Sequence, residues 1–179
     1  MTLDQYAAIG EFVGGIGVIA TLVYLALQIR QNTKSVRSST LAVNSQLWSG
    51  TMMNTLDPNI LPSYLKGSLG EAELDPESFA RFLFTCRAYY VNMENQWYQY
   101  QNGTLEEEIY LGYERSLLNQ MLAYKGMRRY WKMFSNEFSP EFSDYITKLL
   151  TTVPENPPTH MYEEWIRLTR EEKANKSEQ

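Results

Sequence analysis

The chain has 179 residues, of which 44% are hydrophobic, so it can form one modest domain with a core, whereas two independent domains would be cramped. Its net charge of −5 and its pI near 5.0 argue against nucleic-acid binding, which depends on clustered positive charge. The single cysteine, Cys86, excludes an internal disulfide and gives no sign of an oxidising compartment.

The first predicted element is the apolar stretch 10–27, GEFVGGIGVIATLVYLAL. The 24 residues from 6 to 29 would extend about 36 Å as a helix, and a bilayer core requires roughly 20 residues. A cleaved signal peptide would have a basic start and a cleavage site of small residues, and this chain has Glu11 instead. A buried core helix remains an alternative, because the uninterrupted apolar part, 12–27, has only 16 residues and includes three glycines. The favoured prediction is a single transmembrane helix.

Charges of opposite sign flank this stretch. Asp4 lies before it and Glu11 at its start, and Arg30, Lys34 and Arg37 follow it. Basic residues favour the cytoplasmic side of a membrane, which predicts an outside N-terminus, a cytoplasmic C-terminal part and a membrane-surface position for the three bases.

Small residues recur at steps of three and four along the same stretch and therefore share one helical face. Such faces let helices pack closely in lipid, although glycine and alanine are also common in spans for other reasons. We predict a helix–helix contact here, with a second copy of the chain or with another membrane protein. The face comprises Ala7, Gly10, Gly14, Gly17 and Thr21.

The following segment, 30–56, has apolar residues at helical spacing and predicts that the helix continues beyond the membrane. Its content of Ser, Thr and Asn makes it a weak helix, which suits a segment that packs on neighbours. Asp57, Pro58 and Pro62 break the pattern, and a short helix at 60–69 is predicted to end at Gly70.

The central part of the chain predicts a helical hairpin. Asp75, Pro76 and Glu77 form a strong helix start, and the helix should run to about residue 101, before Asn102 and Gly103. Thr104 and Glu107 match a capping box for a second helix, 105–124, antiparallel to the first. The predicted core positions of the two helices are Phe79, Phe82, Cys86, Tyr89 or Tyr90, Met93, Trp97, Tyr100, Leu105, Ile109, Tyr113, Leu117, Met121 and Tyr124.

Three further helices are predicted. Gly126 should separate a helix at 127–138, and Ser139 with Pro140 should cap a helix at 141–151. A rigid loop with Pro154, Pro157 and Pro158 precedes a last helix, capped by Thr159 and ending at residue 170.

The predicted fold class is therefore all-α, with one N-terminal transmembrane helix followed by an antiparallel bundle of about five helices. The predicted organisation is an anchor at 1–30, a juxtamembrane helix and linker at 31–70, a bundle domain at 71–170 and a solvated charged tail at 171–179.

Three stretches resemble a family of uncharacterised bacterial proteins with an N-terminal span and a helical domain. They are GEFVGGIGVIATLVYLALQIRQNT, ENQWYQYQNGTLEEEIYLGY and FSPEFSDYI, most specifically at QIRQNT and YQYQNG. The resemblance covers the anchor and about 79–150 and implies this architecture and a bacterial inner membrane. It implies no catalytic residue, because the family has no assigned activity.

No pattern in the chain predicts catalysis, a metal site or a cofactor. His160 has Glu163 and Glu164 one turn away, but zinc sites need more nitrogen or sulfur ligands than this chain offers. Cys86 lies on an aromatic helix face and is predicted to be a core residue. Glu94 and Glu114 could face each other across the hairpin, but a carboxylate pair alone does not indicate acid–base catalysis.

Bases and aromatic residues alternate in the segment 124–134. Such a helix could contact an anionic lipid surface, or it could be an ordinary amphipathic helix with its aromatic side chains in the core. The four bases are Lys125, Arg128, Arg129 and Lys132.

The sequence therefore favours a non-enzymatic, membrane-anchored interaction or scaffold protein, either a homo-oligomer or an accessory subunit of a membrane complex. The second hypothesis is a small oligomeric pore lined by the Gly/Thr face of the span. An enzyme is the third.

Overall fold

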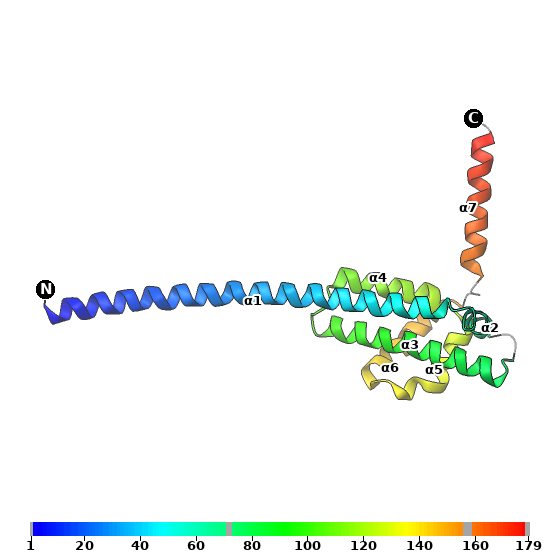
Figure 1. The fold of residues 1–179 in the computed structure, drawn as a ribbon, viewed down its shortest axis with the longest axis horizontal. Helices are drawn as coiled ribbons and strands as arrows, with labels where there is room; N and C mark the ends of the chain where they lie inside the picture. Colours follow the sequence, from blue (N-terminus) through cyan, green and yellow to red (C-terminus); the bar gives the residue numbers. More distant parts are fainter. Residues whose placement is uncertain (1, 71–72, 156–158, 178–179) are drawn as a thin grey trace. The chain divides into compact units, whose positions relative to one another are not determined.

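The computed structural model describes residues 2–70, 73–155 and 159–177 (Figure 1). Within these ranges the chain is helical with connecting turns and has no strand, which confirms the all-α prediction. The chain divides into two compact units, residues 1–42 and residues 43–179. The second unit thus begins inside the segment that the sequence predicted as a juxtamembrane linker.

One uninterrupted helix, α1 (Leu3–Thr55), forms the N-terminal third of the chain. The predicted continuation of the apolar helix through 30–56 is confirmed, because no proline occurs before Pro58 to end it. In the second unit, the α1 residues Asn44 and Thr55 are buried and Trp48 packs against the core. Packing on neighbours thus supports the polar, weakly helical end of α1, as its composition suggested.

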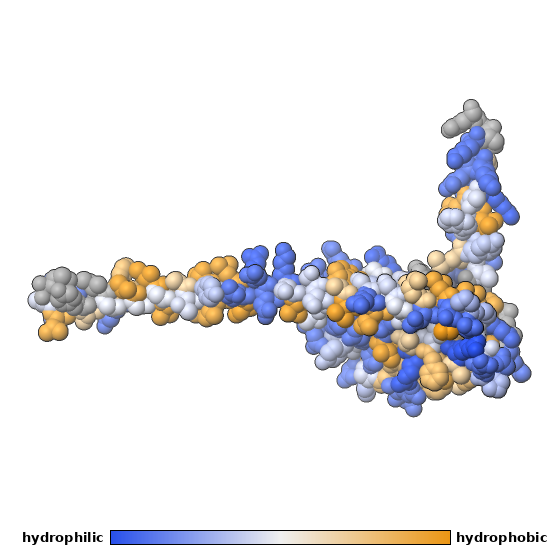
Figure 2. Space-filling view, viewed as in Figure 1, coloured by the Kyte–Doolittle hydropathy of each residue, from blue (hydrophilic) through white to orange (hydrophobic). Residues whose placement is uncertain are grey.

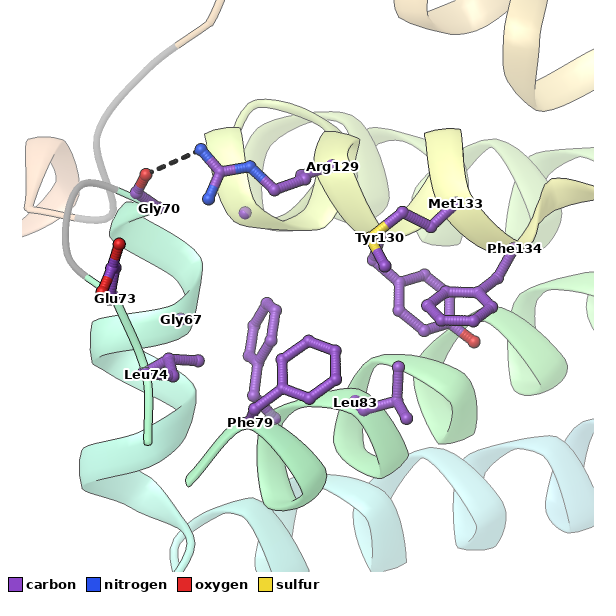
Figure 3. A pocket seen from close by; sticks show the side chains of 12 residues that line it. Gly67, Gly70, Glu73, Leu74, Phe79, Leu83, Arg129, Tyr130, Met133 and Phe134 are labelled. Atoms are coloured by element: carbon purple, nitrogen blue, oxygen red, sulfur yellow. Dashed lines mark hydrogen bonds between the residues drawn. The ribbon is translucent and has the colours of Figure 1, made fainter. Parts of the chain in front are cut away.

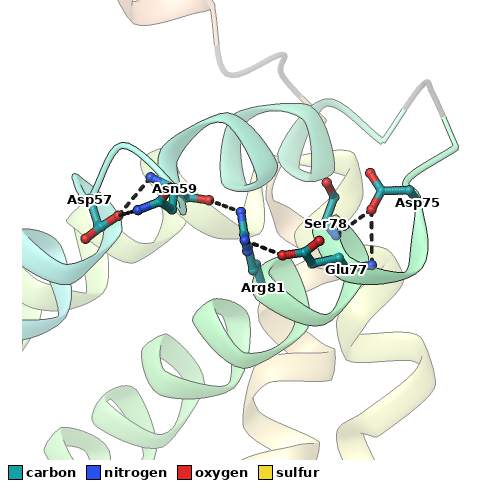
Figure 4. A network of polar contacts seen from close by, with 6 residues as sticks. All are labelled: Asp57, Asn59, Asp75, Glu77, Ser78 and Arg81. Atoms are coloured by element: carbon teal, nitrogen blue, oxygen red, sulfur yellow. Dashed lines mark hydrogen bonds and ion pairs between the residues drawn. The ribbon is translucent and has the colours of Figure 1, made fainter.

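The next two helices, α2 (Leu61–Leu69) and α3 (Pro76–Gln101), match the predicted segments closely. Gly70 ends α2 with a left-handed φ of 64°, a conformation that glycine adopts without steric cost. Asp75 caps α3, because its Oδ1 accepts hydrogen bonds from the backbone nitrogens of Glu77 at 3.1 Å and Ser78 at 2.9 Å (Figure 4). A hydrogen bond from the Ser78 side chain, together with these backbone bonds, lowers the pKa of the Asp75 carboxyl.

Arg81 on α3 links this helix to the turn that precedes α2. Its Nη1 donates to the carbonyl oxygen of Asn59 at 2.7 Å, and its Nη2 pairs with Glu77 one turn away (Figure 4). The turn itself is closed by Asp57, whose Oδ1 accepts from the backbone nitrogen of Asn59 at 2.8 Å. The predicted break after 56 is therefore an ordered connection.

The second helix of the hairpin differs from its prediction. It consists of α4 (Glu107–Leu117) followed by a π-helical turn, η1 (Leu118–Leu122), in place of one helix over 105–124. The predicted capping box is wrong, because the N-cap is Glu106 and the Thr104 hydroxyl donates to the carbonyl of Gln99 at 3.0 Å. The hydroxyl thus helps to close the turn after α3.

The C-terminal half contains α5 (Lys125–Phe134), a 3₁₀ turn η2 (Ser135–Glu137), α6 (Pro140–Thr152) and α7 (His160–Ser177). The helix predicted at 127–138 therefore begins earlier and ends earlier. Ser139 occupies the N-cap of α6 but makes no side-chain cap; its backbone nitrogen donates to Glu94 Oε1 at 2.8 Å. Helix α7 continues through most of the predicted tail, and Pro157 and Pro158 lie outside the described residues.

Gly126 lies inside α5 and does not separate two helices. A Cβ atom at this position would lie 1.8 Å from the carbonyl oxygen of Gly67 on α2. The role of Gly126 is therefore close helix packing, and the prediction of a helix break was wrong.

Aromatic and apolar side chains from α3, η1, α5 and α6 form the core. The predicted core face of α3 is confirmed except at Phe79, which is exposed. Tyr90 is completely buried; its ring stacks on Tyr130 with centroids 5.3 Å apart, and its hydroxyl donates to the carbonyl of Met127 at 3.1 Å. The hairpin is antiparallel, since the rings of Tyr100 near the end of α3 and Tyr110 near the start of α4 stack at 4.3 Å. Among the described residues, the core lies within the second unit.

Candidate functional site

The apolar helix face expected to enter a membrane is exposed in the structure. Within the described residues, α1 is the one helix long and apolar enough to cross a bilayer, with a mean hydropathy of 2.1 over 18 residues and none of that window buried. Figure 2 shows apolar surface along this helix, followed by a hydrophilic band. Within 12–29, the large apolar side chains with at least 48% of their surface exposed are Phe12, Val13, Ile16, Val18, Ile19, Leu22, Val23, Tyr24, Leu25, Leu27 and Ile29.

The small-residue face lies on the same helix and is uncovered. A Cβ atom added at Gly10, Gly14 or Gly17 would meet nothing within 4 Å. Ala7 and Thr21 are also exposed, and the Thr21 hydroxyl donates to the carbonyl of Gly17 at 2.8 Å. These five residues therefore share a shallow face whose one hydroxyl is already hydrogen-bonded within the helix.

The three bases that follow the apolar segment are exposed on α1. Arg30, Lys34 and Arg37 occupy successive turns, and no acidic residue occurs between them. Glu11 and Arg30 bracket the apolar part, and their helical separation is about 28 Å.

The four bases of α5 divide into two pairs. Arg128 is half-buried, with Nε donating to the carbonyl of Leu122 at 2.6 Å and Nη2 to that of Val153 at 2.5 Å. The Nη2 of Arg129 donates to the carbonyl of Gly70 at 2.9 Å. Lys125 and Lys132 are exposed. Two of the four bases predicted to contact lipid, Arg128 and Arg129, thus donate hydrogen bonds to backbone carbonyls within the domain.

The aromatic residues of α5 lie in the core. Tyr124, Tyr130 and Trp131 are buried, and Phe134 packs against the core from its edge. Their burial is the arrangement expected of an ordinary amphipathic helix. The membrane-surface hypothesis for α5 therefore depends on its three exposed bases, Lys125, Arg129 and Lys132.

A polar seam between α1 and α3 was not predicted. Asn44 donates to Gln99 Oε1 at 2.7 Å and accepts from Asn95 at 3.1 Å. Further along, Asn92 donates to the hydroxyl of Thr51 at 2.7 Å, and the hydroxyls of Thr55 and Tyr89 lie 3.1 Å apart. The available signal was the recurrence of Asn44, Thr51 and Thr55 at helical spacing, but their partners are 34 or more positions away in the chain.

Residues with potential chemistry are engaged in structural contacts. Cys86 is fully buried, as predicted, and burial raises the pKa of its thiol well above its usual value. Glu94 accepts from the Ser139 backbone, while Glu114 accepts from the Tyr145 hydroxyl, so each carboxylate has its own partner. His160 lies edge-on to Tyr124, with ring centroids 6.3 Å apart. Among the described residues no three potential ligands gather into a metal site.

The Tyr145 hydroxyl connects α6 to α4. It accepts from the hydroxyl of Tyr110 at 2.6 Å and donates to Glu114. Burial, together with the negative charge of Glu114, raises the pKa of both phenols. Both tyrosines therefore stay protonated over the physiological range and act as neutral hydrogen-bonding groups between α4 and α6.

A cavity of about 260 Å³ opens between α2, the start of α3 and α5 (Figure 3). Its lining is mainly apolar, with Arg129 and Glu73 as its charged members. The sequence did not predict it.

Comparison of the chain with family models, with curated proteins and with solved structures gives no match in any of the three.

Proposed function

We propose that this protein is a membrane-anchored helical interaction protein of a bacterial inner membrane, acting as a homo-oligomer or as an accessory subunit of a membrane complex. The observation that supports the proposal is the complete exposure of the most apolar segment of α1. The proposal assigns no catalytic activity to the domain. It assigns the helical unit 43–179 the role of a cytoplasmic interaction module.

The free energy cost of leaving this apolar segment in water favours its burial in lipid or against another protein. Burying one large apolar side chain is worth about 1.5–3 kcal/mol, so the eleven exposed side chains from Phe12 to Ile29 represent on the order of 15 kcal/mol. Whole domains are stable by only about 5–15 kcal/mol. An uncovered helix of this kind would therefore drive insertion or aggregation.

The length and flanking charges favour lipid as the cover. The helical distance of about 28 Å between Glu11 and Arg30 is close to the hydrocarbon thickness of about 30 Å. With Arg30, Lys34 and Arg37 on the following turns, the positive-inside tendency places the N-terminus outside and the domain in the cytoplasm.

Association through the small-residue face is the second part of the proposal. The open space around Gly10, Gly14 and Gly17 would let a partner helix approach to backbone contact. The pore hypothesis would require polar groups that face a conduit, but the Thr21 hydroxyl is directed to the Gly17 carbonyl. Helix packing is therefore the better-supported use of this face.

Membrane insertion is tested by alkaline carbonate extraction of bacterial membranes that contain the full chain. The native protein should stay in the membrane pellet, and the variant Ile19→Lys with Leu22→Lys should move to the supernatant with its domain folded. The matched control, Val36→Lys with Val43→Lys, should stay in the pellet. Extraction of the native protein by carbonate would refute the anchor.

Orientation and self-association need separate measurements. Protease added to right-side-out vesicles should leave the domain intact, and its cleavage would refute the cytoplasmic assignment. In a membrane two-hybrid assay, Gly14→Ile with Gly17→Ile should abolish self-association, whereas Gly15→Ile, on another face, should not. An unchanged signal from the double variant would leave only the accessory-subunit form of the proposal.

The exposed bases of α5, Lys125, Arg129 and Lys132, provide a subsidiary proposal of contact with anionic lipid, which is tested on the two lysines because Arg129 also binds the carbonyl of Gly70. In the Ile19→Lys, Leu22→Lys background, whose span should no longer anchor the protein, replacing both lysines by glutamine should lower recovery on anionic liposomes, relative to neutral ones, in a flotation assay. Equal recovery of that background on both kinds of liposome would refute the lipid contact.

A further inference from the structure

The cavity between α2, α3 and α5 has the form of a small-molecule site, and its occupancy is independent of the proposed membrane attachment. Phe79, Leu83, Met133 and Phe134 contribute apolar walls, and Arg129 lies along one rim (Figure 3). All of the lining belongs to the second unit of the chain.

The walls of the cavity are fixed by the core. The contact between Gly67 and Gly126 leaves no room for a side chain between α2 and α5, and a Cβ atom at Gly67 would also lie 2.3 Å from the ring of Phe82. Phe82 and Tyr130 are both buried. Because these neighbours cannot move inward without clashes, the cavity cannot close by a small shift of α5.

The apolar walls remain partly exposed. Phe79 is 38% exposed and Met133 is 53% exposed, so both would gain from a cover of apolar atoms. An engineered cavity of about 150 Å³ holds benzene, so by proportion a volume of about 260 Å³ accommodates an apolar body of about ten non-hydrogen atoms. A lipid with two full acyl chains is too large for this space.

Arg129 at the rim of the cavity favours a ligand with an anionic head group. The guanidinium of Arg129 has one hydrogen bond within the described part of the chain, from Nη2 to the carbonyl of Gly70. A guanidinium has five N–H donors in a planar fork that matches a carboxylate. Glu73, at the same rim, repels an anion, but it forms no ion pair with Arg129 among the described residues.

We propose that this cavity binds a small carboxylate with an apolar body of about ten non-hydrogen atoms, its head group on Arg129 and its body between Phe79 and Met133. An arylalkanoate and a medium-chain fatty acid share this chemistry. The site would thus give the domain a small-molecule ligand in addition to its protein partners.

The test uses the full chain in nanodiscs and ligand titration by calorimetry, with empty nanodiscs as the blank. 3-Phenylpropionate and octanoate are the two carboxylate probes, and 3-phenylpropanol and 3-phenylpropylamine are the neutral and cationic counterparts. Saturable binding of either carboxylate, tighter than that of the alcohol and the amine, supports the site. The relative affinities of the two carboxylates distinguish an aromatic from an acyl source.

Two variants assign the head-group contact. Arg129→Gln should weaken carboxylate binding about tenfold and alcohol binding less than about twofold, as loss of a charge-assisted hydrogen bond predicts. Lys132→Gln, on the same helix but outside the cavity, should leave both affinities unchanged. Absence of saturable carboxylate binding to the native protein, or binding of the alcohol or the amine at least as tight as that of both carboxylates, would overturn the proposal without affecting membrane attachment.

Discussion

The side-chain amide of Asn44 donates to Gln99 Oε1 at 2.7 Å, although Asn44 is only 1% exposed and lies 55 residues earlier in the chain. A buried amide is stable only when its hydrogen-bonding groups have partners, and the oxygen of Asn44 is satisfied by Asn95. This pair of bonds fixes how the C-terminal end of α1 packs on α3.

We therefore expect Asn44→Ala to lower the free energy of unfolding of the domain by about 2–3 kcal/mol, because Gln99 Oε1 and Asn95 Nδ2 each lose their bond to Asn44 and keep only the Gln99–Asn95 bond on their other amide atoms. Chemical denaturation of the full chain in nanodiscs, followed by tryptophan fluorescence, measures this change. Gln46→Ala, an exposed amide on the same helix, is the control and should change the stability by less than about 0.5 kcal/mol. Equal effects of the two variants would show that the seam does not stabilise the fold.

Gly126→Ala should be strongly destabilising. The added Cβ would meet the backbone of Gly67 at 1.8 Å, so α2 and α5 must separate at the cost of about 3 kcal/mol or more. Gly112→Ala is a matched control, since a Cβ there meets nothing within 4 Å inside α4 and should stabilise the helix by roughly 0.5–1 kcal/mol. Thermal unfolding followed by circular dichroism should give shifts of opposite sign, and a similar shift for both would contradict the close helix contact.

Arg128→Gln should lower stability by about 2 kcal/mol, because Leu122 and Val153 would lose a charged donor from their carbonyls. Lys132→Gln, exposed on the same helix, should have almost no effect. The comparison is made by urea denaturation at two salt concentrations. Equal stability of the two variants would show that the hydrogen bonds of Arg128 to Leu122 and Val153 do not stabilise the domain.

Alkaline pH should destabilise the domain. Burial raises the folded-state pKa of Cys86 and Tyr90 above their ordinary values of 9.0 and 10.0, so the folded state retains protons that the unfolded state releases. The stabilisation is fully present below about pH 8 and is lost progressively as the pH rises from the unfolded-state pKa values toward the higher folded-state ones. The melting temperature should therefore fall between about pH 8 and about pH 10.5.

Tyr90→Phe isolates the tyrosine contribution to this pH dependence. The variant loses one hydrogen bond to Met127, which costs about 1 kcal/mol at every pH, but its melting temperature should fall less steeply above about pH 9. Tyr98→Phe, at an exposed position, should keep the native slope. A native slope in both variants would contradict the role of Tyr90.

Helix ends that are set by residues adjacent in the sequence were predicted correctly. Asp75 before Pro76 and Asn102 before Gly103 act on their own neighbours, and α3 begins and ends where these residues indicate. The apolar helix was likewise predicted from the run 12–27. The fold class followed from these elements and from helical periodicity elsewhere.

Features that depend on distant contacts were not predictable. Gly126 has the sequence appearance of a helix break, yet its role is set by Gly67, which lies 59 positions earlier in the chain. Thr104 has the spacing of a capping box, but its hydroxyl finds the carbonyl of Gln99 instead. The cavity beside Arg129 exists only because three helices meet there, and no single helix indicates it.

The polar seam also limits how α1 can move. A rotation of this end of α1 about its axis would separate Asn44 from both of its amide partners at once. The two bonds therefore hold the C-terminal end of α1 in one rotational register on α3.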